Sequence, residues 1–466
     1  MILRYESGSM SKNGIRNRFI IVALFLAFLS YEILSFDFGS GLYIISLVFL
    51  CLGSLLKDYV FTGVLNIFTG KNYYLLFYLL LHGIGFFTYH LRLYLGLAVY
   101  DHSEDLINRA LLYSVIAVLI FLLSYSFGKR FIHIKIYSFS NVRFKKLFND
   151  SRTKWILLLL GICLFTGLLW GLMGNIPILI ENYHQSARAE VGKGLGFIEA
   201  ISRSLINLSL LYFIVCFKKR LFPLFFWIFA LFIISLFLLN MDRGGLMKYL
   251  LSIWIVYFVC IKRTTIKHFL VACFLLVILA GAMGAMRTKN LADLAILGGI
   301  ILTEASVEFD NYVEVFNMTE KDGYLYGSTL VPIATLPVPR VIMPDKDKYL
   351  TAGNYFKEYH NHTHIRVGER ISYVGELYLN FGFPGIILGM VLVGILLSVV
   401  DGSLDASSVL SVYLYLQFIN TFSGLNAGDI ATTVIGFFMN NLLVVTSLAF
   451  VCLLICKQKI HAKDFC

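Results

Sequence analysis

The feature that most limits what this chain can fold into is a series of apolar runs, each close to 20 residues long. The hydrocarbon core of a bilayer is about 30 Å thick, and a helix needs about 20 mostly apolar residues to cross it. Of the 466 residues, 58% are hydrophobic and 14% are charged. A water-soluble chain carries about 25% charged residues and cannot hide this much apolar surface. The sequence therefore predicts a polytopic membrane protein.

The apolar runs are predicted to be helices, because a backbone surrounded by lipid must satisfy its own hydrogen bonds. The alternating segments of about ten residues that are typical of outer-membrane barrels do not occur. We therefore predict an all-α fold with about twelve transmembrane helices. The predicted spans are 19–36, 41–57, 73–95, 110–128, 155–176, 201–217, 221–240, 245–261, 268–286, 372–399, 409–426 and 431–456.

The distribution of lysine and arginine predicts the orientation of these spans. The chain has 39 basic and 28 acidic residues and a net charge of +11. With the N-terminus in the cytoplasm, most basic residues fall in cytoplasmic segments, above all in 129–154, and most acidic residues fall outside. Both termini are then cytoplasmic. The basic excess indicates topology and attraction to anionic lipid, and it does not indicate nucleic-acid binding, because no folded basic domain is predicted.

The predicted spans divide the chain into three parts. Residues 1–286 hold spans one to nine with short loops, 287–371 form one large external loop, and 372–466 hold the last three spans and a cytoplasmic tail. Loops of this length inside a compact protein are usually functional.

The large loop has a predicted internal organisation. Residues 294–302 are apolar but too short to cross a bilayer, and they lead into 303–312, which we expect to lie on the outer leaflet or dip into it as a helix. Four prolines between 332 and 344 predict a stiff, extended strap, because proline fixes φ and biases the residue before it.

Several arginines are predicted on the external side. Guanidinium groups grip phosphate through paired hydrogen bonds and stay charged at any physiological pH. The arginines therefore suit a phosphate-bearing ligand, and the alternative is that they meet lipid phosphates or neighbouring acids. The set that we assign to a site is Arg188, Arg243, Arg287, Arg340, Arg366 and Arg370.

Glu376 is the predicted general base, because it lies at the mouth of a span, where partial burial suits proton transfer. The alternative is a carboxylate that favours the start of a helix electrostatically. Glu304 and Glu308 lie four residues apart on one helix face and are rival bases. Asp242 is placed to orient its neighbour Arg243.

Residues 360–364 alternate three histidines, which would face one way in an extended strand and then suit Zn²⁺. No fourth ligand follows at a characteristic spacing, so no metal is predicted. We interpret this segment as a solvated loop, with His362 in contact with sugar or phosphate as the alternative. No nucleotide-binding or hydrolase motif occurs, and no cofactor is predicted. Tyrosines such as Tyr378 are typical of a membrane interface, and some suit stacking on sugar rings.

Three short motifs, together with the predicted topology, resemble the Wzy-type polymerases that assemble O-antigen and capsule repeat units. The motifs are Asp242-Arg-Gly-Gly, Pro337-x-Pro-Arg340 and Gly375-Glu-x-Tyr-x-Asn-Phe-Gly382. Family members also carry arginine-to-glycine gaps in external loops, and Arg366-x15-Gly382 and Arg287-x10-Gly298 are similar to these gaps.

The resemblance implies a membrane glycosyltransferase with a GT-C-like bundle in the bacterial inner membrane, which needs neither metal nor nucleotide sugar. Its substrates would be oligosaccharides on undecaprenyl pyrophosphate, joined at the outer face, with a chain-length regulator as a further candidate partner. The resemblance also implies a direct displacement, in which Glu376 or Glu304 takes the acceptor proton and Arg340, Arg366 and Arg370 hold the departing pyrophosphate. Implied in substrate binding are Arg188, Arg243, Arg287, Asp242, Tyr378, Asn380 and His362.

Three other functions remain open at this point, and one of them is a surface sensor or scaffold that uses the external loop. An O-antigen ligase has the same chemistry with a different acceptor. A flippase or other transporter for lipid-linked oligosaccharides predicts ionisable groups near the middle of the bilayer and related halves of the chain, and neither is found in the sequence.

Overall fold

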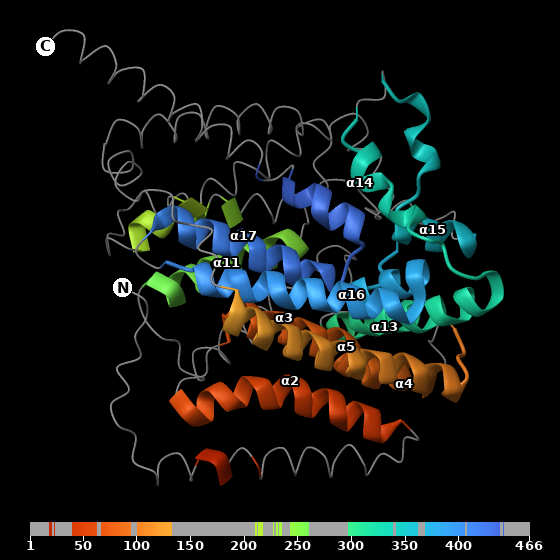
Figure 1. Ribbon diagram of the computed structural model, residues 1–466, viewed down its shortest axis with the longest axis horizontal. Helices are drawn as coiled ribbons and strands as arrows, with labels where there is room; N and C mark the ends of the chain where they lie inside the picture. Colours follow the sequence, from red (N-terminus) through yellow and green to blue (C-terminus); the bar gives the residue numbers. More distant parts are fainter. Residues whose placement is uncertain are drawn as a thin grey trace, which may run out of the picture.

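The computed structural model describes residues 40–62, 67–94, 100–132, 243–260, 297–338, 342–361, 369–405 and 408–438, together with isolated positions. Every regular element within these ranges is helical (Figure 1). The predicted all-α fold is confirmed for this part of the chain.

The long helices run side by side in Figure 1. They are α2 (Gly41–Thr62), α5 (Glu104–Phe131), α11 (Arg243–Cys260), α13 (Leu297–Asp322), α16 (Tyr373–Ser403) and α17 (Val409–Leu425). Another long helix runs without a break through α3 (Gly70–Tyr78), the π-helical turn η1 (Leu79–Ile84) and α4 (Gly85–Tyr94). The short helices are η4 (Ser328–Leu330), α14 (Pro332–Thr335), η5 (Pro344–Lys348) and α15 (Ala352–Tyr359).

Three helices among the described residues are long and apolar enough to cross a bilayer. They are Gly70–Tyr94, Glu104–Phe131 and Tyr373–Ser403, which coincide with three predicted spans. Helices α2, α11 and α17 also coincide with predicted spans. The other six predicted spans lie wholly or mostly outside the described residues, so the number twelve stays a prediction.

Helices α5 and α16 pack closely along their length, because small residues face each other at their crossing. A Cβ added at Gly394 would lie 2.0 Å from the Ser124 hydroxyl, and one added at Gly128 would lie 2.1 Å from the Ser398 hydroxyl. Small residues let two backbones approach in this way in membrane proteins, where lipid removes the usual hydrophobic drive for association.

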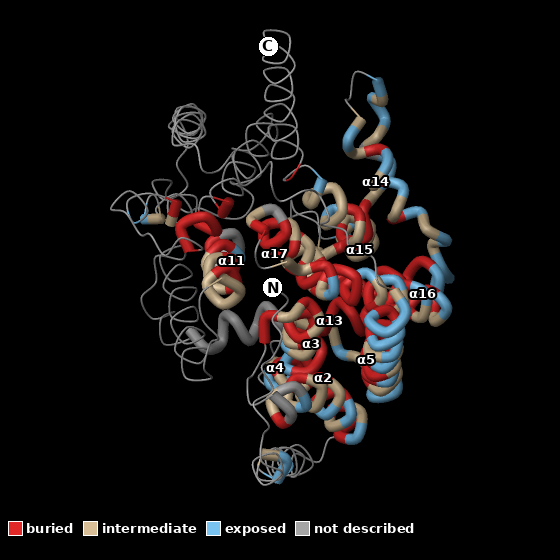
Figure 2. Tube along the Cα trace, turned by 60° about the vertical axis from the view of Figure 1, so that its left-hand side comes forward, coloured by how far each residue is buried: buried red, intermediate tan, exposed pale blue. Residues whose placement is uncertain are grey.

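The outer faces of α5 and α16 are apolar. On α5 the exposed side chains include Leu119, Leu123 and Phe127, and on α16 they include Leu388 and Leu392. Figure 2 shows these two helices exposed on one side and buried on the other. Continuous apolar stripes of this kind mark contact with lipid or another protein, as expected for helices that cross a membrane.

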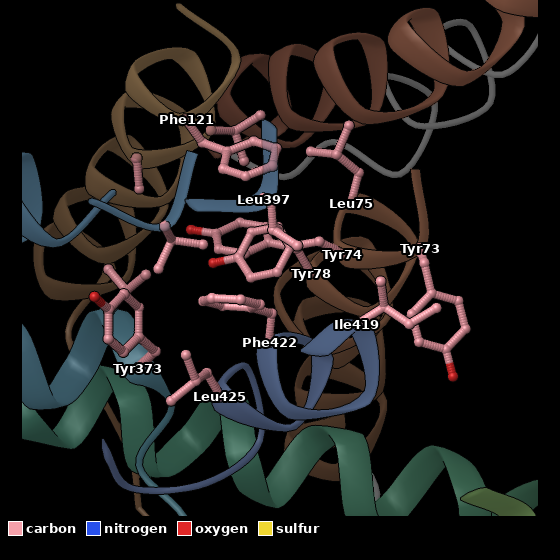
Figure 3. Packing of buried hydrophobic residues seen from close by; sticks show 14 of the residues in the cluster. Tyr73, Tyr74, Leu75, Tyr78, Phe121, Tyr373, Leu397, Ile419, Phe422 and Leu425 are labelled. Carbon is pink, nitrogen blue, oxygen red and sulfur yellow. The ribbon is translucent and has the colours of Figure 1, made fainter. Parts of the chain in front are cut away.

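The inner faces of the helices meet in a core rich in aromatic side chains. Tyr74 and Tyr78 of α3 converge with Phe121 of α5 and Leu397 of α16 (Figure 3). The Tyr74 and Phe121 ring centroids are 4.7 Å apart, and the Tyr78 hydroxyl donates to the Ser114 carbonyl at 3.1 Å. Buried tyrosines need such partners for their hydroxyls, so the core is specified by hydrogen bonds as well as by shape.

Asp401 of α16 forms hydrogen bonds with α3, α5 and α17 at one end of the bundle. Its Oδ1 accepts from the Gly70 N–H at 2.7 Å and from the Tyr415 hydroxyl at 2.9 Å. Its Oδ2 accepts from the Lys71 N–H at 3.1 Å and from the Tyr125 hydroxyl at 2.7 Å. A carboxylate at a helix N-terminus satisfies free N–H groups and complements the helix dipole. Asp401 therefore caps the N-terminus of α3.

Helix α13 lies at the opposite end of α5 and packs along α4, η1 and α16 (Figure 1). The predicted helix over 303–312 is confirmed, and it extends over Leu297–Asp322. Its position on or in the outer leaflet stays a prediction.

The prediction of an extended strap after α13 was wrong where the structure describes it. Pro332 and Pro344 each begin a helical turn, α14 and η5. Proline is well suited to the first turn of a helix, because its φ is already helical and its missing N–H would have no partner there.

Candidate functional site

The middle of α13 carries an unusual set of buried polar side chains. Glu308, Asp310, Asn311 and Glu314 are all buried, and Asp310 is only 1% exposed. Charged groups are rarely buried unless they are paired. The residues that contact these four side chains therefore indicate the function of this region.

Asp310 pairs with His102, which lies just before α5. The His102 Nε2 and the Asp310 Oδ1 are 2.8 Å apart, and both side chains are almost fully buried. Because a carboxylate only accepts, Nε2 carries the proton in this contact. Among the described residues, the second carboxylate oxygen of Asp310 accepts no hydrogen bond.

The backbone of His102 is held in place by a contact with α4 and by the start of α5. The His102 N–H donates to the Tyr89 hydroxyl at 3.3 Å. The next residue, Ser103, caps α5, and its hydroxyl accepts from the Leu106 N–H at 3.4 Å. The imidazole is therefore fixed by a helix start and by α4, on which α13 also packs.

Glu314 lies one turn beyond Asp310 and faces two histidines. Its Oε2 is 3.6 Å from the His102 Nδ1, and its Oε1 is 3.6 Å from the His360 Nε2. The Asn317 amide donates to both Glu314 oxygens, at 3.0 and 3.1 Å. Tyr100 also borders the cluster, since its ring centroid is 5.0 Å from that of His360. We refer to His102, Asp310, Glu314 and His360 as the histidine–acid cluster.

Glu308 holds Arg370, the one predicted site arginine whose side chain the structure describes. The Arg370 Nη1 donates to the Glu308 Oε1 at 2.7 Å. The arginine side chain is 61% exposed, whereas that of Glu308 is 8% exposed. Burial raises the pKa of Glu308, and the guanidinium opposes this rise. Asn311 donates to the Arg370 carbonyl at 3.1 Å, so α13 fixes both the backbone and the side chain of Arg370.

Glu376 is fully buried, although we expected it to be partly exposed at the mouth of a span. Its Oε1 accepts from the Thr329 hydroxyl at 2.9 Å, and its Oε2 accepts from the Ile430 N–H at 2.5 Å. Ile430 begins the helical segment 430–438. Glu376 therefore accepts from the first N–H group of a different helix, a contact that the sequence did not predict. Its role as the base stays a prediction.

Asn380 lies one turn after Glu376 on α16. It also contacts the loop that contains Thr329. Its amide donates to the Thr329 hydroxyl at 2.7 Å, and its side-chain oxygen accepts from the Gly327 N–H at 3.0 Å. These contacts give Asn380 a structural role in holding residues 327–329. Its predicted contact with substrate is not tested.

A break in α16 explains why the motif around Asn380 contains glycine and proline. Gly382 has φ 64° and ψ −152°, and Pro384 has no N–H to offer the Asn380 carbonyl. The freed carbonyls of Leu379 and Asn380 accept from the N–H groups of residues 325 and 326, at 3.0 and 2.9 Å. The loop before η4 thus replaces the hydrogen bonds that the break removes, as broken membrane helices require.

Tyr378 points away from Glu376 along α16. Its ring stacks on Phe316 of α13, with centroids 4.2 Å apart, and meets Tyr324 edge-on at 5.9 Å. The side chain is buried. Its predicted contact with substrate stays a prediction.

The remaining predicted site residues are only partly covered by the structure. Glu304 lies on α13 and Arg243 begins α11, but their side chains are outside the described part. Arg188, Asp242, Arg287, Arg340, His362 and Arg366 lie outside the described residues altogether. Whether the arginines form one phosphate site is therefore untested. Within the described residues, no group of three or more His, Cys, Asp or Glu side chains is arranged to hold a metal ion.

Sequence reasoning missed His102, Asp310 and Glu314 as a group. Asp310 and Glu314 have the four-residue spacing of one helix face, which was visible. His102 lies 208 residues from Asp310, however, and no local pattern links the two.

The fold and this cluster define a membrane protein of packed apolar helices with a group of buried ionisable side chains on and around α13. The family model described as O-antigen polysaccharide polymerase Wzy matches residues 15–459. The chain therefore belongs to the O-antigen polysaccharide polymerase family, and its function is the polymerisation of repeat units into O-antigen in a bacterial membrane. Neither the curated proteins nor the solved structures gave a match to this chain.

Proposed function

We propose that this polymerase extends a glycan carried on undecaprenyl pyrophosphate at the outer face of the inner membrane. The hydroxyl oxygen of an acceptor sugar attacks the anomeric carbon of the donor chain and forms the new glycosidic bond. The bond from that carbon to the pyrophosphate breaks, and its electron pair leaves with the phosphate. Arginine supplies the positive charge that a metal ion supplies in other enzymes, so the reaction is proposed to be metal-independent.

The contacts between loops support the proposed topology. The loop that holds His102 and the loop that holds Asp310 were both assigned to the external side, and they meet at 2.8 Å. The segments that hold Lys71 and Asp401 were both assigned to the cytoplasmic side, and they meet at 3.1 Å. Each of these contacts joins segments assigned to the same side, as the alternating orientation of the spans requires.

Arg370 is the observation that carries the proposal. Its side chain is 61% exposed, while Glu308 accepts from its guanidinium and Asn311 donates to its backbone carbonyl. An arginine held in this way has donors left for a second anion, such as a pyrophosphate oxygen. We propose that Arg340 and Arg366, which both precede it in the same predicted external loop, complete this phosphate site, and that Arg188 and Arg243 seat the lipid-linked substrates.

The test is the length of O-antigen chains on a gel after single substitutions. We expect Arg370→Ala to shorten the chains strongly and Arg370→Lys to shorten them partly, because lysine keeps the charge but loses the paired donors. Lys348→Ala is the matched control, because Lys348 is an exposed cation of the same loop that pairs with Asp345. Long chains in Arg340→Ala, Arg366→Ala and Arg370→Ala alike would contradict the phosphate site.

The same assay separates the polymerase from the ligase. Loss of a ligase leaves long polymer on its lipid carrier, whereas loss of a polymerase leaves single repeats. We expect the Arg370→Ala strain to accumulate single repeats.

A further inference from the structure

The histidine–acid cluster contains a buried acceptor that the fold leaves unused. Asp310 is 1% exposed, and within the described residues only His102 contacts its carboxylate by hydrogen bond. The hydroxyl of Tyr100, which borders the cluster, is also buried without a hydrogen-bond partner in this part of the chain. Buried polar atoms without partners are rare in folded proteins, and they are found where a ligand or a reaction uses them.

Two other carboxylates of this protein, the half-buried Asp401 and the fully buried Glu376, show what a structural role requires here. Both oxygens of Asp401 accept two hydrogen bonds each. Both oxygens of Glu376 accept one. A carboxylate that served only to hold the fold would be expected to match them, and Asp310 does not.

The geometry points to His102 as the group that accepts the proton of the acceptor hydroxyl, with Asp310 as its positioning residue. This inference rests on the proposed function. The protonated Nε2 of His102 donates to Asp310, so in the neutral ring the lone pair lies on Nδ1. In the neutral ring no hydrogen bond forms between Nδ1 and Glu314, because both groups are acceptors. Nδ1 is therefore available to a hydroxyl.

The proton balance of the step follows from this arrangement. The hydroxyl oxygen bonds to the anomeric carbon, its proton passes to Nδ1 of His102, and the pyrophosphate leaves with the electron pair of the broken bond. The imidazolium that forms lies between Asp310 at 2.8 Å and Glu314 at 3.6 Å. Its positive charge is thus compensated on both sides at the moment it appears.

The substrate would enter past His360, which is the most exposed member of the cluster. Its side chain is 15% exposed, against 2% for His102 and 5% for Glu314. His360 ends α15, whose Phe356 packs against it with centroids 4.7 Å apart. The acceptor sugar is therefore expected to lie against the C-terminal end of α15.

The experiment uses full-length protein in detergent with lipid-linked single repeats as substrate. We expect His102→Gly to lower the rate of polymer formation by about a hundredfold or more, which is the usual contribution of a general base. Added imidazole should restore polymer in His102→Gly and should have no effect on Arg370→Ala. Asp310→Asn should lower the rate while His102 remains, and Asp310→Glu should recover part of it.

The control is Glu320→Gln, an exposed residue of the same helix that pairs with Arg109. It should leave the rate unchanged. The inference is overturned if His102→Gly keeps its rate, if imidazole restores nothing, or if the loss of polymer only follows a loss of folded protein measured by thermal unfolding. If the unsubstituted protein forms no polymer from single repeats, the proposed function fails instead.

Discussion

A carboxylate lies near each end of α5, and the two are hydrogen bonded very differently. At one end Asp401 accepts four hydrogen bonds, two of them from the first N–H groups of α3. At the other end Asp310 accepts one, from His102, and Arg370 reaches out to solvent from Glu308. Folding stability favours complete hydrogen bonding, so an unpartnered oxygen on a buried carboxylate is consistent with a functional role. We therefore distinguish a structural end around Asp401 from a reactive end around Asp310.

The largest effect on stability is expected at the structural end. Asp401→Ala would leave two backbone N–H groups and the Tyr125 hydroxyl without an acceptor, whereas the Tyr415 hydroxyl still has the Phe68 carbonyl at 2.9 Å. Each buried donor left without a partner costs about 1–3 kcal/mol, so we expect a total loss of about 3 kcal/mol or more. Thermal unfolding in detergent measures it.

The control for Asp401→Ala is Asp345→Ala, because the Asp345 side chain is 72% exposed. The structural reading of Asp401 would be wrong if the two variants unfolded at the same temperature.

A smaller effect is expected from the break in α16. Gly382 has backbone angles open almost only to glycine, and an added Cβ would lie 2.8 Å from the Tyr324 ring. Gly382→Ala should therefore cost about 1–3 kcal/mol and loosen the loop that covers Glu376.

Gly402→Ala is the matched control in the same helix, since nothing lies within 4 Å of its added Cβ. Equal stability of the two alanine variants would show that the break does not need glycine.

The smallest effect concerns the pH dependence of stability at the reactive end. The folded state raises the pKa of Glu308 above its ordinary value of 4.5 through burial. A raised pKa gives stability that is fully present below the unfolded-state value and is lost as the pH rises through the folded-state value. Glu308→Gln should therefore flatten the fall in unfolding temperature as the pH rises above about 4.5. An unchanged pH profile would mean that Arg370 compensates the burial fully.

The helices of this protein could be predicted from the sequence much better than the site. A run of apolar residues is a local pattern, so a membrane-spanning helix can be recognised from one stretch of sequence. The predicted span 409–426 differs from α17, Val409–Leu425, by a single residue. Pairings between distant residues leave no such pattern. The partner of Arg370 is Glu308, 62 residues away, and the Glu376 carboxylate accepts from the Ile430 N–H, 54 residues away. Glu304 and Glu308 of α13 were predicted as rival bases, but the pairing of His102 with Asp310 and Glu314 depends on how α13 packs on α4.

The most direct test of the comparison is to measure polymer formed per folded protein in Asp310→Asn and in Asp401→Asn. We predict that Asp310→Asn unfolds at the temperature of the unsubstituted protein but forms little polymer. Asp401→Asn should unfold at a lower temperature and form normal polymer per folded molecule. The account would be contradicted if Asp310→Asn lost stability and kept its activity, or if the two variants behaved alike.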